Sequence, residues 1–173
     1  LSTPHPHTPI LSGLVGSEMC IRDRRYTFFT NEWGGIIDDL IVTRCDEYVL
    51  LVLNAAFKEA DITLIRKNLN CEIEVMTDSA LLALQGPASE KILNEIVPGV
   101  KELFFLQAAE FTFAGSPIIV SRSGYTGEDG FEISVQNKNV ENFTKLLSSK
   151  GAKPIGLGAR DTPVSYTHLR AHE

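Results

Sequence analysis

The sequence has few cysteines, and none of them is spaced as in a metal or redox site. Its three cysteines are Cys20, Cys45 and Cys71, and no pair forms a C-x-x-C motif. We therefore expect neither a disulfide framework nor a structural zinc site, and the pattern favours a reducing compartment. No apolar run reaches the roughly 18 to 20 residues that a membrane helix needs, and no signal-peptide pattern opens the chain. We expect no membrane association.

The sequence also lacks an excess of basic residues. It carries 16 Lys and Arg against 22 Asp and Glu, a formal net charge of -6. Without a basic stripe, nucleic acid is disfavoured as the main partner. A chain of 173 residues that is 43% hydrophobic and 22% charged has the composition of one ordinary globular domain.

The two ends of the chain can be encoded by one DNA element in opposite orientations. If residues 14–23 are written CTC GTG GGC TCG GAG ATG TGT ATA AGA GAC, followed by AG, the reverse complement read in a shifted frame encodes residues 164–173. Chance would almost never produce this relation, and the element resembles a transposon-end adapter used to prepare sequencing libraries. We therefore expect 1–24 to be a non-native flank and 163–173 to be translated adapter, which leaves 25–162 as the protein domain.

Histidine is absent from this expected domain. The four histidines of the chain all lie in the flanks, at positions 5, 7, 168 and 172. A His5-x-His7 metal site is therefore not expected, and neither a Ser-His-Asp nor a Cys-His arrangement can be built from residues 25–162. We expect no metal ligands in the domain.

Strand-like and helix-like segments alternate in groups along the domain. Eight segments are rich in β-branched or alternating residues. They are 26–30, 36–43, 48–53, 72–76, 81–84, 110–114, 118–121 and 131–135. Helical spacing is found in three segments, 55–69, the stretch after Pro87, and the stretch from Val140 to Gly151. We expect an α+β fold with mixed or antiparallel sheets and about three amphipathic helices.

Several residues predict the ends of these elements. Asn54 stands where an N-cap of the first helix is expected, and Pro87 suits the first turn of the second. Gly151 suits the C-terminal end of the third helix. The turn at Pro98-Gly99 is a candidate seam between subdomains.

Two adjacent carboxylates interrupt an otherwise apolar strand. Side chains alternate along a strand, so Asp38 is expected to point with Leu40 and Val42, and Asp39 with Ile41. A buried carboxylate needs a partner, so one strand face could present a single carboxylate in an apolar pocket. The alternative is a strand-edge pair that faces solvent or caps a neighbouring loop.

A loop with several glycines, residues 121–130, is the second feature that could carry chemistry. Its glycines permit tight turns and a close approach of ligand. It lacks the Gly-Lys-Ser/Thr ending of a phosphate loop, and Glu128 and Asp129 would repel phosphate. Tyr125 could stack on a flat heterocycle, and an ordinary hairpin loop is the alternative. Arg160-Asp161 could likewise be only a surface pair.

Four groups of segments together resemble the tetrahydrofolate-dependent aminomethyltransferase family of the glycine cleavage system. They occur in the family's order and span nearly all of 25–162. They are 26–42 with YTFFTNE and GGIIDDLIV, 52–56 with VLNAA, 83–87 with ALQGP, and 121–132 together with 156–161. The resemblance implies that the chain is part of the folate-binding region of the aminomethyltransferase fold.

The resemblance also implies roles for individual residues. Asp39 matches the catalytic carboxylate near the reactive edge of tetrahydrofolate, where it positions the attacking amine and supports a cationic intermediate. Glu132 matches a residue that binds the pterin, whose amino group and ring N-H suit one carboxylate. The further residues expected at the folate pocket are Ile41, Asn54, Tyr125 and Arg160.

The implied reaction moves a methylene unit from an aminomethyl group, carried on a lipoylated partner protein, to tetrahydrofolate and releases ammonia. Family members continue on both sides of the matched region, so we expect this chain alone to have little or no activity. A bacterial cytoplasm is the expected location, or a mitochondrial matrix for a eukaryotic source. The alternatives are the folate-binding part of a dimethylglycine or sarcosine oxidising enzyme and a folate-binding scaffold without catalysis.

Overall fold

The chain divides into two compact units, residues 1–75 and 76–173, and each is described here by itself. The computed structural model describes residues 11–12, 24–45 and 47–156. The boundary falls between Val75 and Met76. The seam expected at Pro98-Gly99 is wrong, because that turn lies inside the second unit, where it leads into a short 3-10 helix at Val100–Glu102.

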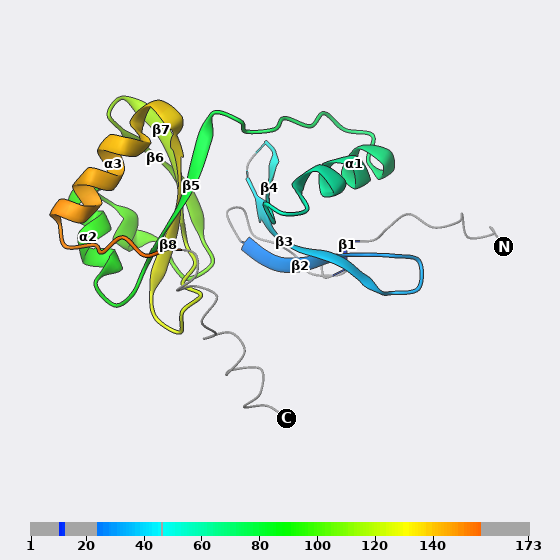
Figure 1. The fold of residues 1–173 in the computed structure, drawn as a ribbon, viewed down its shortest axis with the longest axis horizontal. Helices are drawn as coiled ribbons and strands as arrows, with labels where there is room; N and C mark the ends of the chain where they lie inside the picture. Colours follow the sequence, from blue (N-terminus) through cyan, green and yellow to red (C-terminus); the bar gives the residue numbers. More distant parts are fainter. Residues whose placement is uncertain (1–10, 13–23, 46, 157–173) are drawn as a thin grey trace. The chain divides into compact units, whose positions relative to one another are not determined.

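The first unit is an antiparallel sheet with one helix (Figure 1). The sheet order is β1-β2-β3-β4, and every pairing is antiparallel. Its elements are β1 Leu11–Ser12, β2 Arg24–Thr30, β3 Ile36–Arg44, β4 Val49–Leu53 and α1 Lys58–Asn68. The expected hairpin and third strand are confirmed, while the two-residue β1 falls in a segment from which no strand was expected.

A side chain closes the turn between β2 and β3. Asn31 Oδ1 accepts hydrogen bonds from the backbone N-H of Trp33 at 3.0 Å and of Gly35 at 2.8 Å. Beside this turn the register shifts: Phe29 lies opposite Asp38, but Thr30 lies opposite Ile36. Ile37 is therefore an extra residue in β3, as in a β-bulge.

Helix α1 covers the face of the first sheet that carries Leu40 and Val42. Ile65 of α1 packs against these residues and Phe29 in one buried cluster. The N-cap of α1 is Phe57, and no side chain caps the helix. The expectation that Asn54 is the N-cap is therefore wrong, because its side chain is bound elsewhere.

The second unit is a four-stranded antiparallel sheet, with order β5-β8-β7-β6, covered on one face by two helices (Figure 1). Phe131, Ile133 and Val135 of β8 are fully buried with Phe143 of α3 and Leu93 of α2. The elements are β5 Ser79–Gln85, α2 Ser89–Ile96, η1 Val100–Glu102, β6 Ala108–Phe113, β7 Ser116–Arg122, β8 Gly130–Gln136 and α3 Asn137–Ser149.

Two local expectations, one at the boundary between the units and one in the second unit, need correction. Residues 72–76 alternate in sequence but form no strand in the structure, because no described strand pairs with them and their backbone groups gain nothing from an extended ladder. Helix α2 begins at Ser89 with Ala88 as N-cap, so Pro87 precedes the helix instead of occupying its first turn.

The end of α3 matches the expectation for Gly151. Lys150 is the C-cap, and Gly151 follows it with φ at +99°. Its N-H donates to the carbonyl of Ser148 at 3.0 Å, and the N-H of Ala152 donates to that of Leu147 at 3.0 Å. These two bonds form a Schellman motif, which a residue with free access to positive φ favours.

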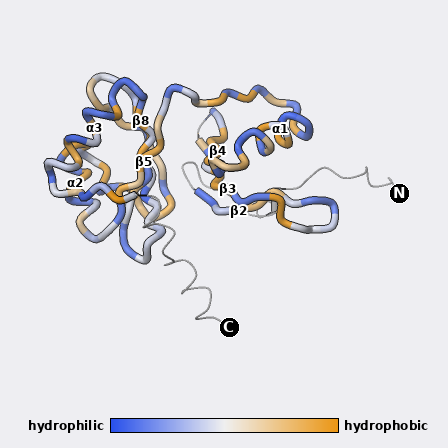
Figure 2. The backbone as a smooth tube through the Cα atoms, in the orientation of Figure 1, coloured by the Kyte–Doolittle hydropathy of each residue, from blue (hydrophilic) through white to orange (hydrophobic). Residues whose placement is uncertain are grey.

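The fold class is confirmed as α+β with antiparallel sheets and three α-helices in the described part of the chain. Hydrophobic and hydrophilic residues alternate along α2 and α3, as an amphipathic helix on a sheet requires (Figure 2). In that same part of the chain, no helix combines the length and the apolar character needed to cross a membrane.

Candidate functional site

Asn54 joins the two adjacent carboxylates of β3. Leu40 pairs with Leu53 across β3 and β4, so the next residue, Asn54, comes beside Asp39. Its Nδ2 donates to Asp39 Oδ1 at 2.9 Å, to the Asp39 carbonyl at 3.1 Å and to Asp38 Oδ1 at 3.0 Å. The amide therefore fixes both carboxylates relative to the end of β4.

The two carboxylates lie on opposite faces of the first sheet. Asp38 is 8% exposed and shares the face under α1 with Leu40 and Val42, which are also buried. Asp39 is half-buried on the other face with Ile41. The predicted alternation is confirmed for these residues. The alternative of a pair that faces solvent is wrong for Asp38, which is buried, but both carboxylates do lie just beyond the last β3–β4 pair, Leu40 with Leu53.

Two aromatic side chains share the face of Asp39. Phe28 lies opposite Asp39 and Tyr26 opposite Ile41, and the two rings meet edge to face with centroids 5.2 Å apart. Loss of hydration, a side-chain hydrogen bond with Asp39 and the nearby negative charge raise the pKa of Tyr26 to about 12. Because Tyr26 is 61% exposed as a whole, its hydrogen bond with Asp39 contributes more to the raised pKa than burial does. The phenol stays protonated and holds Asp39 from a second side.

The second predicted carboxylate, Glu132, lies on the face of the β5–β8 sheet opposite to the one that α2 and α3 cover. Its neighbours in β8, Phe131 and Ile133, point into the core, and it pairs across the sheet with Ser121 and Ala83. Ser123 Oγ donates to Glu132 Oε2 at 3.3 Å. Glu132 is thus half-buried, with the Ser123 hydroxyl on its carboxylate and the Ser121 hydroxyl on its backbone carbonyl at 3.4 Å.

The loop between β7 and β8 is a hairpin connection that is tied to the end of β5. The backbone N-H of Tyr125 donates to Gln85 Oε1 at 3.0 Å, and the side chain of Tyr125 is 36% exposed. A Cβ at Gly130 would lie 2.3 Å from Gln85 Oε1, so glycine is needed for this contact. The segment is a hairpin loop, which was the alternative expected from the sequence, and these contacts hold it in a defined shape.

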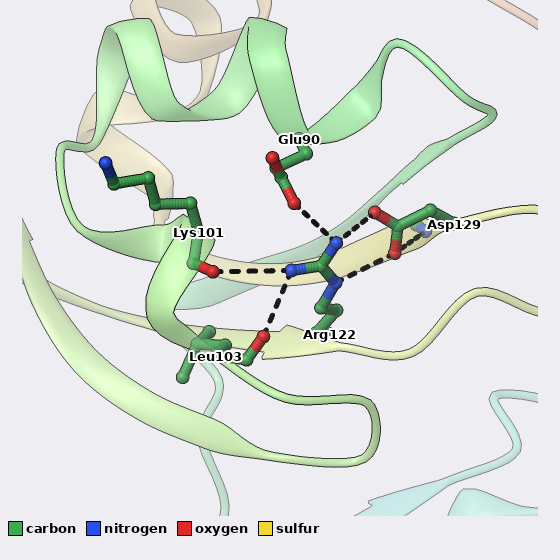
Figure 3. A network of polar contacts seen from close by, with 6 residues as sticks. Glu90, Lys101, Leu103, Arg122 and Asp129 are labelled. Carbon is green, nitrogen blue, oxygen red and sulfur yellow. Dashed lines mark hydrogen bonds and ion pairs between the residues drawn. The ribbon is translucent and has the colours of Figure 1, made fainter.

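Arg122 holds the base of the same loop, and sequence reasoning did not single it out. Its guanidinium donates to Asp129 through Nε at 3.0 Å and Nη2 at 2.6 Å, and to Glu90 Oε2 at 2.5 Å (Figure 3). Nη1 donates to the Leu103 carbonyl at 3.1 Å. Hydrogen bonding to Asp129, against the effect of burial, raises the pKa of Arg122 above its ordinary value. Its position at the start of the 121–130 segment was the available signal.

Replacing Gly124 by alanine is expected to distort this loop. The added Cβ would lie 2.1 Å from the Glu128 carbonyl oxygen, so the backbone must shift, at a cost of about 1 to 3 kcal/mol by analogy with overpacking. Urea denaturation measures the loss of stability. Gly156→Ala is the control, because nothing lies within 4 Å of its added Cβ. Equal stability of both variants would contradict this geometry.

The predicted site residues thus fall into two groups. Asp39, Ile41 and Asn54 lie together in the first unit, and Tyr125 and Glu132 belong to the second. Arg160 lies outside the described residues. Within the described ranges, no group of three or more His, Cys, Asp or Glu side chains is arranged to hold a metal ion.

Comparison with known proteins gives one consistent result. The family model of the GCVT N-terminal domain matches residues 17–164. A probable mitochondrial aminomethyltransferase of Schizosaccharomyces pombe is 43% identical over 142 residues, which cover 78% of this chain and 37% of that protein. An aminomethyltransferase of Clostridium botulinum is 43% identical over 148 residues, covering 79% and 40%.

A solved structure agrees with both sequence comparisons. The crystal structure of glycine cleavage system aminomethyltransferase T from Bartonella henselae matches with a TM-score of 0.71 and 38% identity, covering 83% of this chain and 40% of that one. The chain spans about two fifths of the length of the curated relatives named above. The family match includes residues 17–23, which we expect to be non-native, and the origin of the flanks stays a prediction. On this evidence, the chain belongs to the family of the GCVT N-terminal domain.

Proposed function

We propose that this chain supplies tetrahydrofolate-binding residues to an aminomethyltransferase of glycine cleavage. The complete protein would transfer a methylene unit from an aminomethyl group on a lipoylated carrier protein to tetrahydrofolate, with release of ammonia. Membership of the family and the relatives' names support the reaction class. The source would be a bacterial cytoplasm or, for a eukaryote, the mitochondrial matrix.

The observation that carries the proposal is the fixed carboxylate of Asp39. Asn54 and Tyr26 hold it on a sheet face where Phe28 and Ile41 supply apolar surface. A flat heterocycle with an amine at its edge suits such a face, because rings pack on aromatic and aliphatic side chains while the carboxylate faces the amine. A carboxylate that is already oriented stabilises positive charge that develops on that amine without further reorganisation.

Glu132 is the proposed ligand of the pterin ring. A pterin presents an amino group beside a ring N-H, and one carboxylate accepts both in a paired, charge-assisted geometry. The hydrogen bond from Ser123 to Glu132 Oε2 orients this carboxylate. Tyr125 is proposed to line the pocket, since its backbone is held by Gln85 while its ring is partly exposed. Arg160 stays a proposed neighbour of the site.

Replacing Glu132 by glutamine in the complete protein tests folate binding. The amide can accept only one of the two proposed hydrogen bonds and carries no charge, so the dissociation constant for tetrahydrofolate should rise about tenfold, or about 1.4 kcal/mol. Calorimetric titration measures the change.

Glu141→Gln is the matched control, because Glu141 is exposed on α3, where it forms an ion pair with Lys145. Equal affinity of native protein and Glu132→Gln would exclude Glu132 as the pterin ligand. Failure of the native complete protein to bind tetrahydrofolate would overturn the proposed function itself. We expect the 173-residue chain alone to bind weakly and to lack turnover.

A further inference from the structure

Two buried carboxyl groups lie between α1 and the first sheet, and neither takes part in the proposed reaction. Asp61 of α1 is 1% exposed and Asp38 of β3 is 8% exposed. Within the described residues, no N-H or hydroxyl group donates to Asp38 Oδ2 or Asp61 Oδ2, although both atoms are buried. Two ionised carboxylates in such a place would repel each other strongly.

A shared proton resolves this conflict. Asp38 and Asp61 form a side-chain hydrogen bond with one another, and only a carboxylic acid O-H can be its donor. Burial, followed by the hydrogen bond and charge of Asp38 and the charge of Asp39, raises the pKa of Asp61 to about 6. Paired carboxyl groups that hold one proton in common are a known solution to this kind of crowding.

The charged groups of β2 do not contribute to the shift of the Asp61 pKa. Arg25 lies opposite Val42, on the sheet face that Asp38 shares, Arg24 lies opposite Thr43, and Tyr26 is bonded to Asp39. Lys58 and Glu59, in the first turn of α1, do not contribute to the shift of the Asp61 pKa. The position of Asp61 in that first turn favours its ionised form, and the shift shows that burial and Asp38 outweigh this effect.

The pair is connected to Asp39 through one amide. Asp38 Oδ1 accepts from Asn54 Nδ2 at 3.0 Å, while Asp38 Oδ2 is buried and receives no hydrogen bond from an N-H or hydroxyl group of the described residues. The same Nδ2 donates to Asp39 Oδ1 at 2.9 Å. The rotamer of Asp38 therefore sets the direction of the Asn54 amide, and the amide sets the position of the Asp39 carboxylate.

We propose that Asp61 is a positioning residue, which shares a proton with Asp38 and thereby fixes Asn54 and Asp39 on the opposite face of the sheet. The expected effect on turnover rests on the proposed function, whereas the shared proton does not depend on it. When the pair loses its proton, two charges face each other under α1, and Asp38 loses the donor that held its rotamer. Asn54 then no longer fixes Asp39.

The proton can be tested on the 173-residue chain without any ligand. We expect the side-chain carboxyl ¹³C resonance of Asp61 to titrate near pH 6, and the Asn54 amide ¹⁵N resonance to shift with the same midpoint. In Asp61→Asn the new amide donates to Asp38 Oδ2 permanently, so the Asn54 shift should disappear. Titration of Asp61 near pH 4, as in an ordinary aspartate, or an Asn54 resonance that does not change with it, would overturn the proposal.

The pH dependence of folding stability provides a second test of the shared proton. The folded state holds the proton more tightly than the unfolded chain, so stability falls as pH rises between about 4 and 6 and is flat above. Between about pH 4.5 and 6, the unfolding constant of the native chain should rise about tenfold relative to that of Asp61→Asn. Asp78→Asn, at an exposed aspartate, should follow the native profile.

Turnover of the complete protein tests the positioning role. At pH 8 we expect kcat of Asp61→Asn to equal or exceed the native value several-fold, and at pH 5, where the native pair holds its proton, we expect kcat of Asp61→Ala to be at least tenfold below the native value. Identical pH profiles of native protein and Asp61→Asn would contradict the role. If no variant or native protein turns over, the proposed function fails, while the carboxyl titration still decides whether the pair shares a proton.

Discussion

Turnover of the complete protein is expected to fall at least 100-fold when Asp39 is replaced by asparagine, while tetrahydrofolate binding stays within a few-fold. The loss of one oriented group that supports charge in a transition state costs on the order of 10² to 10³ in kcat. Asparagine keeps the size of the side chain and can still accept from Asn54, whose Nδ2 lies 2.9 Å from Asp39 Oδ1. The measurement is steady-state turnover with the lipoylated carrier protein, beside a calorimetric folate titration.

The matched control for this variant is Asp78→Asn. Asp78 is exposed and stands before β5, so the same chemical change there should leave kcat and binding as in the native protein. Unchanged turnover in Asp39→Asn would favour a scaffold that binds folate without catalysing transfer. Folate-dependent turnover of N-methylated glycines, without the carrier protein, would instead favour a dimethylglycine or sarcosine oxidising relative.

Replacing Arg122 by methionine is expected to destabilise the second unit by about 3 kcal/mol. Breaking a buried ion pair by removing one partner leaves the other charge uncompensated, which costs about 3 to 5 kcal/mol when burial is complete. The side chain of Arg122 is 19% exposed and that of Glu90 is 43% exposed, so solvent screening places the expected value at the lower end. Methionine keeps the aliphatic stem near the Phe131 ring, over which the guanidinium lies at 5.4 Å.

Urea denaturation followed by circular dichroism measures this loss, and hydrogen exchange locates it. Amides of β7 and β8 should lose protection, while those of β2 and β3 should keep it. The control is Lys145→Met, which breaks a 2.6 Å ion pair whose side chains are 73% and 79% exposed, and should change stability by less than about 1 kcal/mol. Equal effects of the two variants would show that the Arg122 network is no stronger than a surface pair.

Short-range sequence patterns correctly predicted a hairpin, a helix end and the two faces of β3. The turn at residues 31–35 between two β-rich runs predicted the β2–β3 hairpin, and Gly151 predicted the end of α3. The alternation around Asp38 and Asp39 predicted which side each carboxylate takes. In each case the deciding interaction lies within a few residues of the chain.

The errors come from interactions between residues that are distant in sequence. Asn54 has the right place and type for a helix cap, but its amide is satisfied by Asp38 and Asp39, 16 and 15 residues earlier. Residues 72–76 alternate as a strand would, yet have no described neighbour to pair with. Nothing local marks Asp61 as the partner of Asp38, because that contact exists only once α1 lies on the sheet.

The pocket assignments have a different origin. The roles of Asp39 and Glu132 came from the family resemblance. Residue patterns alone left the Asp38-Asp39 pair open between a carboxylate in an apolar pocket and a strand-edge pair, and did not single out Glu132. The structure adds their hydrogen-bond partners, Asn54 for Asp39 and Ser123 for Glu132, which no spacing rule could supply. Their roles toward folate stay predictions until the variants are measured.

The register shift beside the β2–β3 turn makes the two carboxylates insensitive to the length of that turn. Ile36 and Ile37 are both exposed, so the extra residue sits where neither face is packed. An insertion or deletion among residues 31–35 can be absorbed there, before the register reaches Asp38. A one-residue insertion between Ile37 and Leu40 cannot be absorbed by the bulge. It would therefore exchange the sheet faces of the two carboxylates, Asp38 and Asp39. Homologous chains should therefore vary in turn length on one side of this point and keep a constant count of residues on the other.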